Sequence, residues 1–133
     1  MTGSDAESLV RRFLELATTR RAAEAVELLH PDVEWRNSGW PTIRGRRVAA
    51  MLRDMDRRGV GFEVEMHHLA AEGDVVLTDR TDILGLGRWR TSFHVNGTFR
   101  VREGRVVLWD DHFSNLALVA GGIRGLSGLL RRP

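Results

Sequence analysis

The sequence of 133 residues contains no cysteine, no tyrosine and no lysine. Without cysteine the chain can form no disulfide, offers no thiolate nucleophile and supplies no sulfur ligand to a metal. The five histidines show no ligand spacing of the His-Glu-x-x-His kind, so we expect no metal site. His67 and His68 are adjacent, and within a strand they would point to opposite faces, one exposed and one packed.

The sequence also lacks a large excess of either charge: it has 20 arginines and 18 acidic residues, which give a net charge of +2. The arginines come in pairs such as Arg11-Arg12 and Arg57-Arg58, separated by acids, which indicates solvated helix faces. No apolar run approaches the about 20 residues that cross a membrane. The N-terminal residues lack the basic and apolar segments of a signal peptide. We therefore expect a cytoplasmic protein with no nucleic-acid and no membrane partner.

The length is typical of one domain, so we expect residues 1–133 to form a single domain with a core and room for a pocket. Ser4, followed three residues later by Glu7, has the pattern of a capping box before the first apolar periodic run. Pro31 and Gly59 are stop signals for the next two runs. The predicted helices cover residues 4–18, 20–29 and 45–58.

Strand-like alternation dominates the rest of the chain, interrupted by turns at residues 72–74, 85–87 and 103–104. The tail from Leu116 to Leu130 is apolar but holds four glycines, each of which costs a helix about 1 kcal/mol. It is expected to be a broken or frayed helix that covers the pocket mouth or a second subunit. Helices followed by long antiparallel strands predict an α+β fold, with the helices on one face of a curved sheet. The predicted strands cover residues 32–37, 60–68, 75–84, 89–102 and 105–114.

Polar residues appear on strand faces that would otherwise be apolar. Asp111 lies between Trp109 and Phe113 on one face of the last strand, and a buried carboxylate needs a partner or a raised pKa. Arg80 and Asp82 share a face of the strand 75–84, so an arginine could hold two carboxylates in one site. The opposite face of that strand is equally apolar, so Arg80 and Asp82 could instead be a surface ion pair. Asp111 could likewise be a structural acid without a catalytic role.

Trp35 and Asn37 point to the same side of the short strand 32–37. An asparagine amide can donate to and accept from one water molecule at once. The alternative is that Asn37 is only a turn residue before Ser38-Gly39. The candidates for an apolar pocket wall are Trp35, Trp40, Met51, Met55, Leu84 and Phe113.

Three segments together resemble the limonene-1,2-epoxide hydrolase family: Trp35-Arg36-Asn37, Arg80-Thr81-Asp82 and Trp109-Asp110-Asp111-His112-Phe113. The resemblance follows the order of elements from Ser4 to Phe113. It implies an NTF2-like cone, in which a curved mixed or antiparallel sheet and N-terminal helices on its concave side enclose a pocket. It also implies hydrolysis of an epoxide to a vicinal diol without metal or cofactor, and a homodimer, for which an apolar outer face of the sheet would provide the surface.

Carried over from the family, Asp111 would be the general base for a water that Asn37 helps to hold. Asp82, protonated, would be the general acid for the epoxide oxygen, and Arg80 would bridge the two carboxyl groups. The apolar pocket would accept a small lipophilic epoxide.

The family has a tyrosine where Trp35 stands, and an indole N–H only donates. A substrate hydroxyl could therefore replace the water, as in an epoxide-opening cyclase. Two further alternatives are a polyketide cyclase or isomerase of the SnoaL-like type and a non-catalytic ligand-binding module. A catalyst needs one neutral and one ionised carboxyl group, whereas a structural network tolerates two ionised ones against Arg80.

Overall fold

The computed structural model describes residues 2–130. No helix among them is long and apolar enough to cross a membrane. Over these residues four helices and six strands follow one another: α1 (Gly3–Thr18), α2 (Ala22–Glu27), β1 (Leu29–Asn37), β2 (Ile43–Arg44), α3 (Arg46–Arg57), β3 (Gly61–Glu72), β4 (Val75–Leu86), β5 (Trp89–Arg102), β6 (Arg105–His112) and α4 (Asn115–Leu130).

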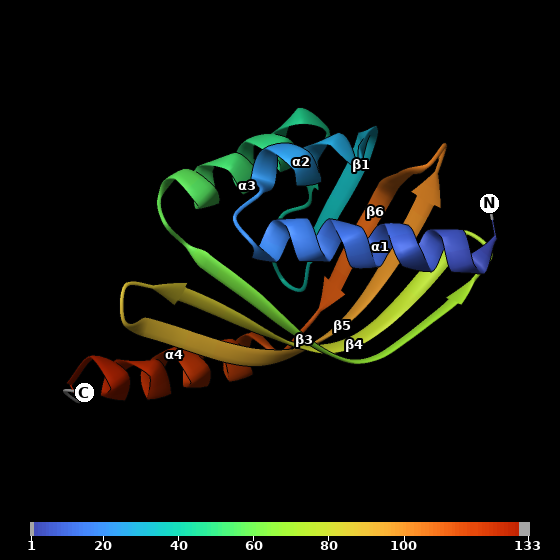
Figure 1. Cartoon of the computed structure of the whole chain (residues 1–133). Coiled ribbons are helices and arrows are strands. Elements are labelled where there is room, and N and C mark those ends of the chain that lie inside the picture. Colours follow the sequence, from blue (N-terminus) through green and yellow to red (C-terminus); the bar gives the residue numbers. More distant parts are fainter. Residues whose placement is uncertain (1, 131–133) are drawn as a thin grey trace.

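The six strands form one strongly curved sheet in the order β2-β1-β6-β5-β4-β3 (Figure 1). β1 pairs in parallel with β6, and every other neighbouring pair is antiparallel, so the sheet is mixed. Helix α1 crosses the concave side and contacts β3, β4, β5 and β6; α2 lies next to α1, and α3 lies next to α2 (Figure 1). The predicted α+β fold, with helices on the concave side of a curved sheet, is confirmed.

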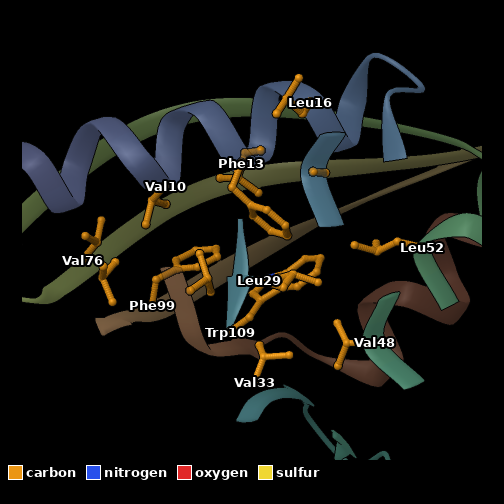
Figure 2. Close-up of a cluster of buried hydrophobic side chains, with 14 of the residues drawn as sticks. Val10, Phe13, Leu16, Leu29, Val33, Val48, Leu52, Val76, Phe99 and Trp109 are labelled. Carbon is orange, nitrogen blue, oxygen red and sulfur yellow. The ribbon is translucent and has the colours of Figure 1, made fainter. Parts of the chain in front are cut away.

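Trp109 of β6 lies at the centre of the core between α1 and the sheet (Figure 2). Its ring meets Phe13 of α1 edge-on at 5.1 Å between centroids, stacks on Trp35 of β1 at 4.2 Å and lies 6.2 Å from Phe99 of β5. Such aromatic pairs contribute about 0.5–1.5 kcal/mol each beyond the burial of their area. β6 is therefore fixed by core packing two residues before Asp111.

The first two helices differ from the prediction at their ends. Thr2, not Ser4, caps α1: its Oγ1 accepts a hydrogen bond from the backbone N–H of Asp5 at 3.2 Å, and Asp5 closes the capping box. Helix α2 ends at Glu27, and Pro31 lies inside β1 instead of ending a helix. Pro31 falls in the irregular stretch of the β1–β6 pairing, where its missing N–H costs no ladder hydrogen bond.

The prediction of one exposed and one packed histidine in β3 is wrong, because His67 and His68 are both exposed. The pairing of β3 with β4 shifts between Met66 and His68, and this bulge turns both imidazoles to the outer face. There His67 is hydrogen-bonded to Thr81 Oγ1 at 2.8 Å, and His68 to Asp79 at 3.0 Å.

The C-terminal segment is one continuous helix, α4, and not the broken or frayed helix expected from its glycines. It runs beside β5, apart from α1, α2 and α3 (Figure 1). A Cβ atom on Gly125 would lie 1.8 Å from the carbonyl oxygen of Arg90, and one on Gly121 would lie 2.6 Å from Thr91 Oγ1. The glycines therefore let the helix backbone approach the strand, which offsets their low helix propensity.

We expect Gly125→Ala to loosen α4 from β5, because its Cβ would overlap backbone atoms that cannot rotate away. Gly122→Ala is the matched control, since its Cβ would make an ordinary contact of 3.4 Å with the Trp89 ring. In an isolated helix both changes would stabilise by about 1 kcal/mol. Hydrogen–deuterium exchange of the α4 amides should therefore rise in Gly125→Ala and stay equal or fall in Gly122→Ala. Equal protection in the two variants would contradict the close approach.

Candidate active site

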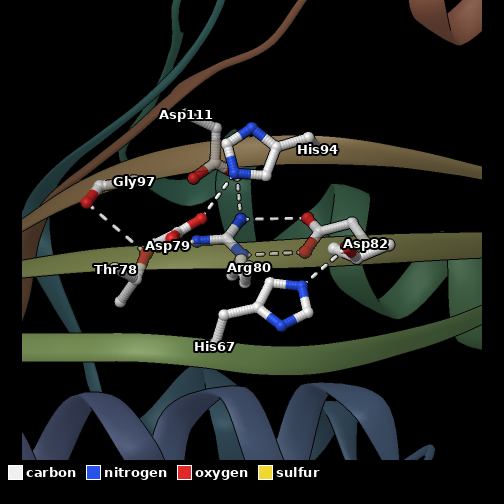
Figure 3. Close-up of polar contacts among 9 residues, drawn as sticks. His67, Thr78, Asp79, Arg80, Asp82, His94, Gly97 and Asp111 are labelled. Carbon is white, nitrogen blue, oxygen red and sulfur yellow. Dashed lines mark hydrogen bonds and ion pairs between the residues drawn. The ribbon is translucent and has the colours of Figure 1, made fainter.

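Arg80 of β4 lies between two carboxylates, Asp82 of the same strand and Asp111 of β6 (Figure 3). Its Nε and Nη2 donate to Oδ1 and Oδ2 of Asp82 at 2.8 and 2.9 Å, and Nη2 is also 2.8 Å from Oδ2 of Asp111. Arg80 is 0% exposed, and each carboxylate residue is 4% exposed. The face of β4 that carries Arg80 and Asp82 is thus the inner one, and they do not form a surface ion pair.

Strand order brings these three residues together. β5 lies between β4 and β6, with Arg80 paired to Val95 and Asp111 paired to Gly97. The guanidinium of Arg80 therefore reaches across the whole width of β5 to meet Asp111.

The charges in this cluster change the proton affinity of its members. Burial raises the pKa of Asp111 to about 6, although the positive charge of Arg80 and its contact with Asp111 oppose this, and the charge of Asp82 adds to the rise. Burial alone would lower the pKa of Arg80, but the charges of Asp111 and Asp82 outweigh it and keep the guanidinium protonated. One cation faces two carboxyl groups, so a single added proton makes the buried cluster neutral.

The two carboxyl groups line a cavity of about 450 Å³ whose other walls are almost entirely apolar. Arg80 is not part of the cavity lining. All six predicted pocket-wall residues do line the cavity, with Trp40 (60% exposed) and Met51 (40% exposed) the most accessible of them. The indole N–H of Trp40 donates to Asn115 Oδ1 at 2.9 Å and so ties the loop before β2 to the start of α4. The lining residues include Trp35, Asn37, Trp40, Met51, Met55, Asp82, Leu84, Asp111 and Phe113.

Sequence reasoning missed part of the wall. Ile43 belongs to the two-residue strand β2, which is too short to show any periodicity. Leu118 lies on α4, and the expectation that the tail covers the pocket mouth is the only signal that pointed to it. The remaining wall residues outside the six predicted ones are Pro41, Leu52, Phe62, Phe93 and Trp109.

Asn37 reaches the cluster through the parallel pairing of β1 and β6, in which it is paired with Asp111. The same pairing places Trp35 against Trp109. Asn37 is both a cavity residue and the last residue of β1, and its carbonyl accepts a hydrogen bond from the backbone N–H of Trp40 at 3.0 Å. The two interpretations from the sequence, cavity residue and turn residue, are therefore compatible.

Three buried polar atoms beside the cavity lack a well-formed hydrogen bond among the described residues: Nε1 of Trp35, Nε1 of Trp109 and Oδ1 of Asp111. A buried polar group without a partner costs about 1–3 kcal/mol, which marks this place as one where stability is not maximised. Oδ1 is the oxygen of Asp111 that the ion pair with Arg80 does not use. Asp111 thus keeps an oxygen that Arg80 does not occupy, although the Trp109 side chain also lowers the pKa of this carboxyl group.

The part of the chain from residue 2 to 130 holds no group of three or more His, Asp or Glu side chains arranged to bind a metal ion. The chemistry that the side chains themselves offer is proton transfer by two carboxyl groups whose charges are coupled through one arginine.

Comparison with known proteins identifies relatives of this chain in sequence and in structure. Residues 4–124 match the family described as the limonene-1,2-epoxide hydrolase catalytic domain. Over 103 residues the chain is 46% identical to epoxide hydrolase EphG of Mycobacterium tuberculosis (strain ATCC 25618 / H37Rv). The aligned segment covers 77% of this chain and 68% of that protein.

Solved structures support the same family and fold. An LEH-like epoxide hydrolase from M. tuberculosis superposes with a TM-score of 0.91 at 40% identity, over 96% of this chain and 91% of that one. An NTF2-like protein from Burkholderia xenovorans LB400 has a TM-score of 0.73 at 19% identity, over 92% of this chain and 98% of that one, and shows the fold alone. The predicted NTF2-like fold is confirmed, and the chain belongs to the limonene-1,2-epoxide hydrolase family.

Proposed function

We propose that this protein hydrolyses a small lipophilic epoxide to a vicinal diol, with Asp111, Arg80 and Asp82 as the reacting cluster. The observation that carries the proposal is one buried arginine held between two buried carboxyl groups beside an apolar cavity. Membership of the family and the 46% identity to a protein named epoxide hydrolase support the class of reaction.

Asp111 is proposed as the general base. Its raised pKa of about 6 lies near neutrality, where a carboxylate is ionised and yet basic enough to accept a proton from water. Oδ2 faces Arg80, so Oδ1 takes the proton, while Asn37 beside it holds the water. The water oxygen forms the new bond to one epoxide carbon, and the carbon–oxygen bond of the ring breaks.

Asp82 is proposed as the general acid that gives its proton to the departing epoxide oxygen. Arg80 balances only one of the two carboxylates, so one proton on the pair neutralises the buried cluster, and this mechanism requires that proton on Asp82 while Asp111 is ionised. Arg80 holds both oxygens of Asp82, and one of these contacts must be released for Asp82 to deliver its proton. Because Arg80 also contacts Asp111, it keeps an ion pair both before and after the proton has changed sides.

Trp35 replaces the tyrosine expected from the family. Its ring stacks on Trp109 with an interplanar angle of 9° and forms part of the cavity wall. An indole cannot accept a proton from water, so Asn37 and Asp111 are proposed to orient the water without it. The mainly apolar wall favours substrates that have no charge and few polar groups.

We also propose a homodimer, and α4 as its surface. The outer sheet face carries polar side chains such as His67, His68 and His94, contrary to the apolar outer face expected from the sequence. Four large apolar residues of α4, spaced by three or four positions, are instead 49–80% exposed: Leu116, Val119, Ile123 and Leu126. A cytoplasmic location stays a prediction from the sequence.

The first prediction concerns the origin of the diol oxygen. In oxygen-18 water the wild type should convert a lipophilic epoxide to labelled diol, read by mass spectrometry. Asp111→Asn and Asp82→Asn should each lower the rate by about 10²–10⁴-fold, the usual contribution of one proton transfer. Asp110→Asn is the control, because Asp110 neighbours Asp111 but pairs with the exposed His112 at 3.3 Å.

Near-normal turnover in either cluster variant would refute the role given to that residue. If a hydroxy-epoxide instead yields an unlabelled cyclic ether, the protein is an epoxide-opening cyclase.

The second prediction concerns pH. With the pKa of Asp111 at about 6, kcat/KM should fall about tenfold per pH unit below that value, because the base becomes protonated. The contribution of Asp111 to the free energy of unfolding should change in the opposite direction and rise as kcat/KM falls. The folded pKa lies above the ordinary 3.8, so the folded protein binds this proton more tightly than the unfolded chain. Asp111 therefore favours folding increasingly as the pH falls from about 6 to about 4.

Denaturant unfolding of wild type and Asp111→Asn across this pH range isolates that contribution. The free energy of unfolding of the wild type should rise relative to that of Asp111→Asn as the pH falls, and a constant difference would contradict the raised pKa.

The third prediction concerns assembly. Light scattering after gel filtration should give a dimer for the wild type and a monomer for Ile123→Glu, because a buried unpaired carboxylate opposes association. Leu77→Glu, 53% exposed on the outer sheet face, is the matched control and should stay dimeric. Dissociation by Leu77→Glu alone would place the interface on the sheet.

A further inference from the structure

We propose that Gly97 and Thr78 are positioning residues for the active site: the missing side chain of Gly97 leaves the passage through which Arg80 reaches Asp111, and Thr78 fixes the guanidinium in that passage. The inference rests on the proposed function of the cluster and adds two residues that do not contact the substrate.

The first support is the arrangement of the three strands. Thr78 of β4 is paired with Gly97 of β5, which is paired with Asp111 of β6, so the three residues form one row across the sheet. Arg80 belongs to the next row, opposite Val95. Its guanidinium must lean back by one row and cross β5 at Gly97 to contact Asp111.

The space above Gly97 allows this crossing. A Cβ atom there would lie 2.5 Å from Nη1 of Arg80, 2.6 Å from Oγ1 of Thr78 and 2.9 Å from Oδ1 of Asp111. These three residues are at most 4% exposed, so none of their side chains has free room into which it can withdraw. The backbone of Gly97 does not have a positive φ, so the fold does not need glycine for its conformation. A glycine inside a strand weakens it, and here the close approach of Arg80 accounts for it.

Thr78 supplies the remaining contact of the guanidinium. Nη1 of Arg80 donates to Oγ1 of Thr78 at 3.1 Å, and this hydroxyl donates in turn to the carbonyl oxygen of Gly97 at 3.4 Å (Figure 3). The guanidinium is thus held in its plane by Asp82, Asp111 and Thr78, while the Phe99 ring lies 5.8 Å beneath its central carbon. Without the hydroxyl, Nη1 would lose its acceptor and the plane could turn away from Asp111.

The consequence is electrostatic as well as geometric. Arg80 is the strongest influence that opposes the rise in the pKa of Asp111 that burial causes, and the Trp109 side chain adds a weaker one. A guanidinium displaced from Asp111 leaves burial less opposed, so the pKa of Asp111 rises further and less of the base is ionised near neutral pH.

Two sets of variants test this, one at Thr78 and one at Gly97. Thr78→Val removes the hydroxyl at nearly constant volume, Thr78→Ser restores it, and Thr81→Val alters the outer face of the same strand. Gly97→Ala fills the passage, and Gly61→Ala is its control, because that Cβ would make only an ordinary contact of 3.7 Å.

Hydrolysis of limonene 1,2-epoxide and titration of the Asp111 carboxyl carbon by NMR are the readouts. We expect kcat to fall about 10–100-fold in Thr78→Val and Gly97→Ala, the usual effect of removing a residue that orients a reacting group, with little change in KM. In both, the acid limb of the rate profile and the NMR titration of Asp111 should move to higher pH. Thr78→Ser, Thr81→Val and Gly61→Ala should behave like the wild type.

The proposal is overturned if Thr78→Val keeps wild-type kcat and titration, if Thr78→Ser is as impaired as Thr78→Val, or if folded Gly97→Ala matches Gly61→Ala. Should Gly97→Ala not fold, the threonine pair decides. If the wild type itself does not hydrolyse the probe, the proposed function fails for this substrate. The NMR titration still tests the positioning of Arg80, because it needs no turnover.

Discussion

The active-site half of this molecule depends on one buried guanidinium shared by two buried carboxyl groups. Moving such ions out of water costs several kcal/mol each, and only close, well-aligned contacts compensate. Arg80 meets that condition with a bidentate contact to Asp82 and a third contact to Asp111 at 2.8 Å. The burial that makes the cluster expensive also raises the pKa of Asp111 to about 6, where a carboxylate is a useful base. Cost and function therefore have the same physical origin.

Strand pairing and core packing together place Asp111 and Asn37 beside each other. Trp109 anchors β6 among Phe13, Trp35 and Phe99, and Asp111 follows two residues later on the same inner face. The parallel pairing of β1 with β6 brings Asn37 alongside, although the two residues are 74 positions apart in the chain. A packing core and a polar cluster thus share one strand, which leaves the cluster little freedom to move.

Glycine has the same physical use at two places in this fold. Gly121 and Gly125 let α4 approach the backbone of β5, and Gly97 lets the Arg80 side chain cross that same strand. In each case a residue that lowers intrinsic helix or strand propensity allows a contact that any Cβ would prevent. Local propensity alone predicted a broken helix at the first place and nothing at the second, because the space that matters belongs to another element.

The sequence by itself determined the order of the long helices and strands, the inner face of β6 and the family, because side-chain alternation and short motifs are local properties. It also paired Arg80 with Asp82, since residues two apart in a strand share a face. Only the tertiary structure decided that this face of β4 is buried, because its two faces are similarly apolar and the choice depends on what packs against them. The bulge at His67 and His68, the row through Gly97 and the cavity wall at Ile43 and Leu118 likewise arise from pairing between distant segments, which no local pattern records.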